Sequence, residues 1–265
     1  MPDDPPDQSD QLAVTDSIAL LRRFTPARIG LGRAGTGQRT TTILQFMLDH
    51  ARARDAVHTA LDFEAVGRLL GERGWSVVRV HSAAGDRTEY LRRPDLGRRL
   101  SPMGYPLFEE GMRGSDVAIV AADGLSALAI ETNLAPLLDG LRPLLLARHR
   151  TIGPLVLVEQ GRVAIGDEIG QLLGAKLTVV LIGERPGLSA ADSLGAYITW
   201  QPRIGTMDSS RNCISNIRPG GLSPEEAAAQ IGDMIEQAFA HHMTGVRLND
   251  VRAVAPGVPL VTHRL

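Results

Sequence analysis

Two segments of this chain are apolar at almost every position, and they constrain the fold more than any other feature of the sequence. Residues 117–121 read Val-Ala-Ile-Val-Ala and precede Asp123-Gly124, whereas residues 177–182 read Leu-Thr-Val-Val-Leu-Ile and precede Gly183-Glu184. A strand with apolar side chains on both sides is covered on both faces, which is typical of parallel sheets flanked by helices. The two segments therefore predict strands at the centre of a mostly parallel sheet.

Further strands and helices are predicted around this centre. The strands are expected over residues 75–80, 155–158 and 197–200, and the helices between them over 134–146 and 167–173. Strands that alternate with helices favour a sheet with helices on both faces. The predicted fold class is therefore α/β, with a Rossmann-like, mostly parallel sheet. Ligands of such sheets bind at the carboxyl ends of the strands, where we expect the turns at 123–126 and 183–188.

The chain before residue 75 has a helical character. Apolar residues recur at helical spacing in three segments. A short amphipathic helix is predicted over 11–24, a second helix over 41–54 with Ile43, Leu44, Met47 and Ala51 on one face, and a third over 62–74 with Phe63, Val66, Leu69 and Leu70 pointing inward.

The last strong helix has the clearest start signal. Ser223 can cap it, Pro224 fits the first helical position and Glu226 completes a capping box. Its apolar face is expected to carry Ile231, Met234, Ile235 and Ala238. The predicted organisation is a disordered, Asp- and Pro-rich lead over 1–10, a helical part over 11–74, the sheet domain over 75–250 and an extended tail over 251–265.

Composition excludes several classes of function. The net charge is −2 and the isoelectric point is about 6.4, so no overall field attracts nucleic acid or an anionic membrane. No apolar run approaches the roughly 20 residues that span a bilayer, and the N-terminus carries no secretory signal. Cys213 is the one cysteine, and the seven histidines show no metal-ligand spacing, so we expect no disulfide and no metal site. The sequence indicates a cytoplasmic protein.

A glycine-rich string near the N-terminus matches a nucleotide-binding fingerprint in letters. Gly30-x-Gly32-x-x-Gly35 has the dinucleotide spacing, but that motif needs a strand before it and a helix that begins at the pyrophosphate. The alternative is a tight connection whose glycines allow positive φ angles.

Three other features have both a structural and a functional interpretation. The arginines between Arg87 and Arg99 can bind an acidic partner or pair with the acids between them. Cys213 can be a half-buried structural residue, a nucleophile if a base lies beside it, or a contact residue in a ligand pocket. Glu184 follows a buried strand and can accept ligand hydrogen bonds or pair with Arg185.

Six short strings, in their order along the chain, resemble the small subunit of ethanolamine ammonia-lyase, an adenosylcobalamin-dependent enzyme. The resemblance extends from about residue 18 to about residue 242. The strings lie at residues 28–35, 92–99, 115–126, 161–163, 181–188 and 211–216.

The resemblance implies a cofactor-holding subunit without a catalytic residue of its own. In this family a Rossmann-like small subunit packs against a large barrel subunit that holds ethanolamine, and the corrin lies between them. The enzyme converts ethanolamine to acetaldehyde and ammonia by a radical mechanism. The resemblance implies that Val163, Glu184 and Cys213 contact the cobalamin. The chain lacks an Asp-x-His-x-x-Gly string, so we expect the cofactor to be bound base-on.

Two other functions remain as alternatives at this stage. One is a free-standing Rossmann-type, nucleotide-dependent oxidoreductase that uses the fingerprint at 30–35. The other is a thiol hydrolase built on Cys213. Some family members carry a longer N-terminal extension linked to bacterial microcompartments, and the short acidic lead of this chain argues against that location.

Overall fold

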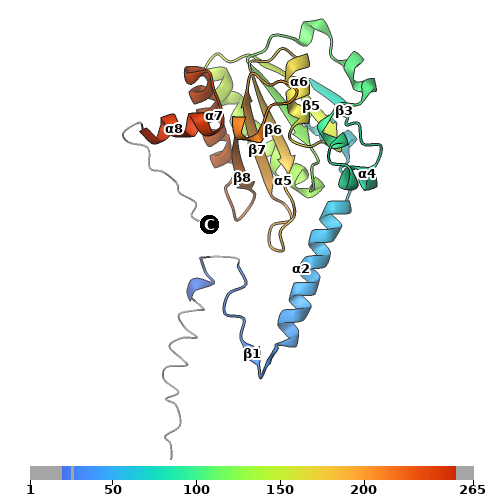
Figure 1. Cartoon of the computed structure of the whole chain (residues 1–265), viewed down its shortest axis with the longest axis vertical. Helices are drawn as coiled ribbons and strands as arrows, with labels where there is room; N and C mark the ends of the chain where they lie inside the picture. The colour runs from blue at the N-terminus through green and yellow to red at the C-terminus, as the bar shows by residue number, and fades with distance from the viewer. Residues whose placement is uncertain (1–19, 25–26, 255–265) are drawn as a thin grey trace, which may run out of the picture.

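A six-stranded sheet forms the centre of the computed structural model, which describes residues 20–24 and 27–254 (Figure 1). The strands lie in the order β3-β5-β4-β6-β7-β8. The first four strands in this order are parallel to one another. Strand β7 runs antiparallel to β6, and β8 runs antiparallel to β7. Their bounds are β3 Val77–His81, β4 Val117–Ala122, β5 Ile152–Glu159, β6 Leu177–Gly183, β7 Leu194–Trp200 and β8 Arg211–Ile217. The prediction of an α/β fold with a mostly parallel sheet is confirmed.

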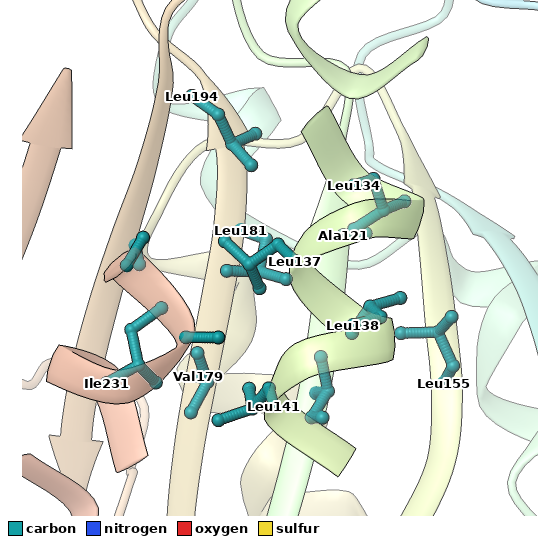
Figure 2. Packing of buried hydrophobic residues seen from close by; sticks show 14 of the residues in the cluster. Ala121, Leu134, Leu137, Leu138, Leu141, Leu155, Val179, Leu181, Leu194 and Ile231 are labelled. Atoms are coloured by element: carbon teal, nitrogen blue, oxygen red, sulfur yellow. The ribbon is translucent and has the colours of Figure 1, made fainter. Parts of the chain in front are cut away.

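Helices cover both faces of the sheet. One face packs against α3 (Phe63–Glu72), α5 (Ala127–Ala147) and α7 (Pro224–His241). Figure 2 shows the leucines of α5 at 134, 137, 138 and 141 directed at the strands. The other face packs against α6 (Ile165–Leu172) and a segment of short 3-10 helices, η1 Leu96–Arg98, η2 Pro102–Leu107 and η3 Glu110–Met112. The apolar run of β4 is explained by this arrangement, because Ile119 joins the first core and Val120 the second.

Start signals in the sequence correctly predict where α3 and α7 begin. The side chain of Ser223 accepts from the backbone of Glu226, whose carboxylate accepts from the backbone of Ser223, so the predicted capping box is confirmed. Asp62 caps α3 in a similar way. The prediction that Leu69 points inward is wrong, since it is 38% exposed while Leu70 is buried.

Residues 211–217 form an edge strand where the sequence indicated only a polar stretch. Ile214 and Ile217 are buried, but Cys213 is exposed on the other side of β8. A strand at the edge of a sheet with one covered face is apolar only at alternate positions. The pattern was therefore too weak to predict β8.

The last helix also differs from the prediction. Residues 251–254 were predicted to be extended, yet they end α8 (Val246–Val254). Asn212 of β8 holds the start of this helix, because its side chain accepts from Gly245 N–H at 2.7 Å and donates to Asn249 at 2.9 Å. These contacts between distant parts of the chain cannot be seen in the local sequence. The lead over 1–10 and residues 255–265 lie outside the described residues.

A long segment precedes the sheet domain and extends away from it (Figure 1). It contains a small hairpin of β1 (Arg33–Ala34) and β2 (Gly37–Gln38), followed by α2 (Thr40–His58). Ile43, Leu44 and Met47, which were predicted to share one face of this helix, are all exposed. Of the helix predicted over 11–24, residues 11–19 lie outside the described residues, and 20–21 are helical.

No helix in the described part of the chain combines the length and apolarity that crossing a membrane requires.

Candidate functional site

The turns after β4 and β6 meet at the edge where the parallel strands end, which we call the carboxyl edge. The backbone N–H of Leu125 donates to the carbonyl of Gly183 at 2.9 Å. Gly124 has a φ of 56°, and a Cβ there would overlap the Gly183 carbonyl oxygen. A Cβ on Gly183 would in turn overlap the carbonyl oxygens of Asp123 and Ser126. Glycine is required at both positions, and the predicted proximity of the two turns is confirmed.

The connections that follow the neighbouring strands β4 and β5 separate here, because β4 leads to α5 on one face of the sheet and β5 leads to α6 on the other. Asp123 spans this opening and accepts from Gly161 N–H at 3.3 Å and from the guanidinium of Arg87 at 3.3 Å. Burial raises the pKa of the Asp123 carboxyl to about 6, although Arg87 and the backbone donors oppose this effect. Arg87 also donates to the carbonyl of Gly124 at 2.9 Å. These contacts make the carboxyl edge rigid.

Two adjoining cavities lie at this edge and share a wall. The larger has a volume of about 390 Å³ and the smaller about 260 Å³, and both are lined by Arg162, Val163 and Tyr197. Glu184 lines the larger cavity and Cys213 the smaller. The structure thus brings together the three residues Val163, Glu184 and Cys213, which lie on three different segments of the chain.

Glu184 is held by the protein through one carboxylate oxygen. Oε2 accepts from the hydroxyl of Ser193 at 2.6 Å and from the backbone N–H of Asn216 at 3.2 Å. Oε1 has no hydrogen-bond partner among the described residues, and Glu184 forms no ion pair with Arg185 there. The structural alternative of pairing with Arg185 is therefore not what the structure shows. The free oxygen can accept hydrogen bonds from a ligand.

Gly195 and Tyr197 of β7 lie beside this carboxylate, and Cys213 of β8 lies next to Tyr197. A Cβ on Gly195 would meet Glu184 Oε1 at 2.9 Å and the ring of Tyr197 at 3.2 Å. Tyr197 pairs with Cys213 across β7 and β8, so both side chains lie on the same face of the sheet. Cys213 is exposed to solvent, but it lies in a concave surface where desolvation raises the pKa of its thiol. Such a thiol is a poor nucleophile at neutral pH.

The turn before α6 supplies hydrogen-bond donors. The carbonyl of Val163 accepts from Gly166 N–H, but the N–H of Val163 has no partner within the described ranges. The guanidinium of Arg162 stacks on the ring of Tyr90 at 4.2 Å, and its buried Nε also has no partner there. The buried Nε of Arg162 is not accessible from the cavity, whereas the N–H of Val163, in a turn that lines both cavities, is a free donor for a ligand that accepts hydrogen bonds.

Sequence reasoning missed Arg162, Gly195 and Tyr197. Arg162 lies inside the string at 161–163, which was a usable signal. Gly195 and Tyr197 reach the site through the pairing of β6 with β7, which no local pattern gives.

The other candidate motifs lie away from these cavities or are paired within the chain. Gly30, Gly32 and Gly35 have φ angles of 57°, 71° and 61°; the first two precede the hairpin before α2 and Gly35 lies in its turn, so the tight-connection interpretation fits. In the arginine-rich stretch, Arg93 pairs with Asp95 and Arg99 with Glu168, while Arg98 lines the smaller cavity. Within the described residues, no group of His, Cys, Asp and Glu is arranged to hold a metal ion.

Comparison with known proteins agrees with the resemblance seen in the strings. The family model for the ethanolamine ammonia-lyase light chain (EutC) matches residues 15–249. An ethanolamine ammonia-lyase small subunit from Azotobacter vinelandii is 52% identical over 239 residues, which cover 89% of this chain and 88% of the relative. The small subunits from Xanthomonas campestris pv. campestris and Pseudomonas aeruginosa are 50% and 51% identical over 241 and 234 residues, covering 89% and 87% of this chain and 88% and 86% of the relatives. The match extends over nearly the whole chain, and the chain therefore belongs to the ethanolamine ammonia-lyase light-chain family.

Proposed function

We propose that this chain is the small subunit of an ethanolamine ammonia-lyase and forms one wall of its adenosylcobalamin site. The complex converts ethanolamine to acetaldehyde and ammonia, and the bound cofactor supplies the radical that starts the reaction. The observation that carries the proposal is the convergence of Val163, Glu184 and Cys213 on two adjoining cavities in a chain of this family. We expect the complex to be cytoplasmic.

The residues at the carboxyl edge fit a corrin. A flat macrocycle with a rim of amide groups needs a smooth wall and both donors and acceptors around it. Tyr197 and Cys213 line the smaller cavity, and Gly195, next to Glu184 Oε1, adds no side chain to this surface. Glu184 Oε1 is a free acceptor, and the backbone N–H of Val163 is a donor without a partner among the described residues.

Each of these residues would bind or orient the cofactor, and none is placed to move a proton. Glu184 would accept amide N–H bonds, which as charge-assisted contacts contribute about 1.5–3 kcal/mol each. Val163 would donate through its backbone N–H, so its side chain can vary. Cys213 would pack against the macrocycle as a small polarizable group. With the thiol pKa raised and no histidine among the cavity-lining residues, the thiol-hydrolase alternative has no support.

A second protein is needed to complete the site. Each cavity is near or below the lower end of the volumes that hold drug-sized ligands, roughly 300–1,000 Å³, so a much larger cofactor extends beyond both. The name of the relatives, small subunit, implies a large one. We propose that a large barrel subunit covers the carboxyl edge, holds ethanolamine and encloses the corrin against this chain.

We further propose that the cofactor is bound base-on, with its own dimethylbenzimidazole on cobalt. No histidine lines either cavity in the described part of the chain, so nothing here is placed to displace that base. An electron spin resonance spectrum of the Co(II) form should show the nitrogen of dimethylbenzimidazole. Histidine nitrogen on cobalt would refute the base-on assignment.

The oxidoreductase alternative is not supported. The fingerprint at 30–35 does not join a strand of the main sheet to a helix, because it lies in the small hairpin before α2.

The decisive experiment is co-expression of this chain with a large subunit of the family. The purified complex should bind adenosylcobalamin in an absorbance titration and release acetaldehyde from ethanolamine. Titration of the chain with NAD(H), followed by fluorescence, should show no binding. Acetaldehyde production by the large subunit alone at the same rate would overturn the proposal.

A further inference from the structure

The segment that precedes the sheet domain is apolar on its surface. We call residues 20–24 and 27–58 the N-terminal arm. Ala56 is the buried residue of α2, and the side chains towards the start of the helix are open to solvent. The exposed apolar residues of the arm are Leu20, Leu21, Phe24, Leu31, Ile43, Leu44, Phe46, Met47 and Leu48. The five on consecutive turns of α2, Ile43, Leu44, Phe46, Met47 and Leu48, are typical of an interaction surface.

The exposed apolar side chains of α2 do not form a single narrow stripe. At 100° per residue, Ile43, Leu44, Phe46, Met47 and Leu48 cover an arc of about 200° around the helix axis. A helix that lies on a flat surface needs one apolar face, whereas a helix that is apolar around more than half of its circumference is enclosed by its partner. This distribution favours a groove in a protein over a membrane surface.

The C-terminal end of the arm is attached at the carboxyl edge. The last turn of α2 is fastened there, since the guanidinium of Arg87 donates through Nε to the carbonyl of Val57 at 2.7 Å and through Nη1 to the carbonyl of Gly124 at 2.9 Å. Gly124 also lines the larger cavity. A protein that covers this cavity therefore meets the last turn of α2, from which the rest of the arm extends.

The charge of the arm indicates what kind of partner it fits. Residues 20–58 contain seven arginines and two aspartates, a net charge of +5 in a chain whose total is −2. Arg52 and Arg54 are more than 60% exposed, and each has only a long, weak ion pair with a nearby aspartate. Two arms of this charge repel each other, which disfavours a second copy of the chain as the occupant.

We propose that the N-terminal arm docks into an apolar groove with an acidic rim on the large subunit, next to the cofactor site. The inference rests on the proposed function, because it names the segment by which this chain holds the partner that closes the cofactor cavities. The sheet edge then supplies contacts to the cofactor, and the arm supplies affinity for the partner.

The test measures the affinity of the full chain for the purified large subunit. The double variant Leu44→Asp/Met47→Asp places charges on two side chains that are 59% exposed, so the fold of the sheet domain should not change. We expect its Kd to rise by at least about 100-fold, since each buried side chain of this size accounts for about tenfold or more. Leu146→Asp is the matched control, since Leu146 is 54% exposed at the far end of α5, and its Kd should stay within about threefold of the parent value.

A second variant tests the charge without altering the apolar surface. Arg52→Glu/Arg54→Glu should slow association with the large subunit and make the affinity less sensitive to salt. Near-ultraviolet circular dichroism of Trp75 and Trp200 reports whether the sheet domain is unchanged in every variant.

The outcomes separate the inference from the proposed function. If the parent chain fails to bind the large subunit, the proposed function is wrong and the inference falls with it. If the parent and the Leu44→Asp/Met47→Asp variant bind equally well, the inference is wrong and the proposed function stands. Sedimentation that shows a homodimer lost in this variant would assign the arm to a second copy. Binding to phosphatidylcholine–phosphatidylserine vesicles that is lost in this variant would assign it to a membrane; either result overturns the proposal.

Discussion

Replacement of Glu184 tests the cofactor wall most directly, because one of its oxygens is committed to the protein and the other is free. Oε2 accepts from the hydroxyl of Ser193 at 2.6 Å and from the N–H of Asn216 at 3.2 Å. Because Asn216 is exposed, water can accept from its N–H when the carboxylate is removed. Glu184→Ala should therefore leave the fold intact and remove an acceptor for the amide rim of the corrin.

The size of the effect follows from one charge-assisted hydrogen bond. Such a bond contributes about 1.5–3 kcal/mol, which corresponds to a Kd for adenosylcobalamin about 10- to 150-fold higher in the variant. Glu184→Gln keeps the shape, but its amide oxygen is needed to accept from Asn216 N–H in place of Oε2, which leaves the NH2 group facing the ligand; its Kd should therefore rise about as far as that of Glu184→Ala. Ser193→Ala removes an anchor of Oε2 but leaves Oε1 in place, and its Kd should rise less than tenfold.

The assay is an absorbance titration of the purified complex with adenosylcobalamin, with thermal unfolding as the control for folding. A Kd for Glu184→Ala within twofold of the parent, in a complex with unchanged thermal stability, would refute the reasoning. A loss of activity without a change in Kd would also contradict it, because Glu184 is assigned to binding alone.

Three further predictions concern the same edge. The pKa of Asp123 is about 6 in the folded chain and 3.8 ordinarily, so the folded state binds more protons than the unfolded state between these values, and stability falls as pH rises through that window. The unfolding free energy of the parent, measured in urea, should fall by up to about 3 kcal/mol more between pH 4 and pH 7 than that of Asp123→Asn; equal declines would contradict this. Gly183→Ala should lower the unfolding free energy by about 1–3 kcal/mol, because its Cβ overlaps backbone oxygens, whereas Gly71→Ala, with open space around it, should not; equal stabilities would contradict this. Cys213→Ala should retain lyase activity with less than a tenfold rise in the Kd for adenosylcobalamin, and in the parent the raised pKa should make alkylation by iodoacetamide at pH 7 slower than in a free cysteine peptide; an inactive variant would restore the nucleophile hypothesis.

The central strands could be predicted from the sequence because both of their faces are buried. Every residue of β4 is buried and apolar, so the strand appears in the sequence as a continuous apolar run. The start of α7 could be predicted because the capping box depends only on residues three positions apart. By contrast, β8 depends on pairing with β7 at the edge of the sheet, and its alternating pattern is short and polar.

Helix α2 shows why an apolar pattern does not reveal what covers it. Its periodicity correctly predicted a helix, but Leu44 and Met47 lie open to solvent in this chain. The physical requirement that apolar surface be buried is the same for a core and for an interface. A pattern in one chain therefore cannot separate the two, and the structure adds that the described residues of this chain leave these side chains exposed.

The position of Glu184 at the carboxyl edge could be predicted because it follows an apolar strand, whereas its role as a site residue came from the family resemblance. Arg162 and Tyr197 could not be ranked in this way, since their importance depends on the shared wall of two cavities. That wall forms where the β5–α6 turn meets β7, two segments about 30 residues apart in sequence.

A buried ion pair explains how Val163 and Cys213 stay in register although they belong to different segments. Arg211, two residues before Cys213 in β8, binds both carboxylate oxygens of Asp167 in α6, at 2.5 and 2.6 Å, and both side chains are almost completely buried. Asp167 lies one helical turn after Val163, so the pair ties the start of α6 to the edge strand beneath the smaller cavity. Desolvation makes such a pair a weak source of net stability, but its two-point geometry fixes the position of one segment relative to the other. The wall of the proposed cofactor site is therefore set before any ligand arrives, and ordering these two segments adds no cost to cofactor binding.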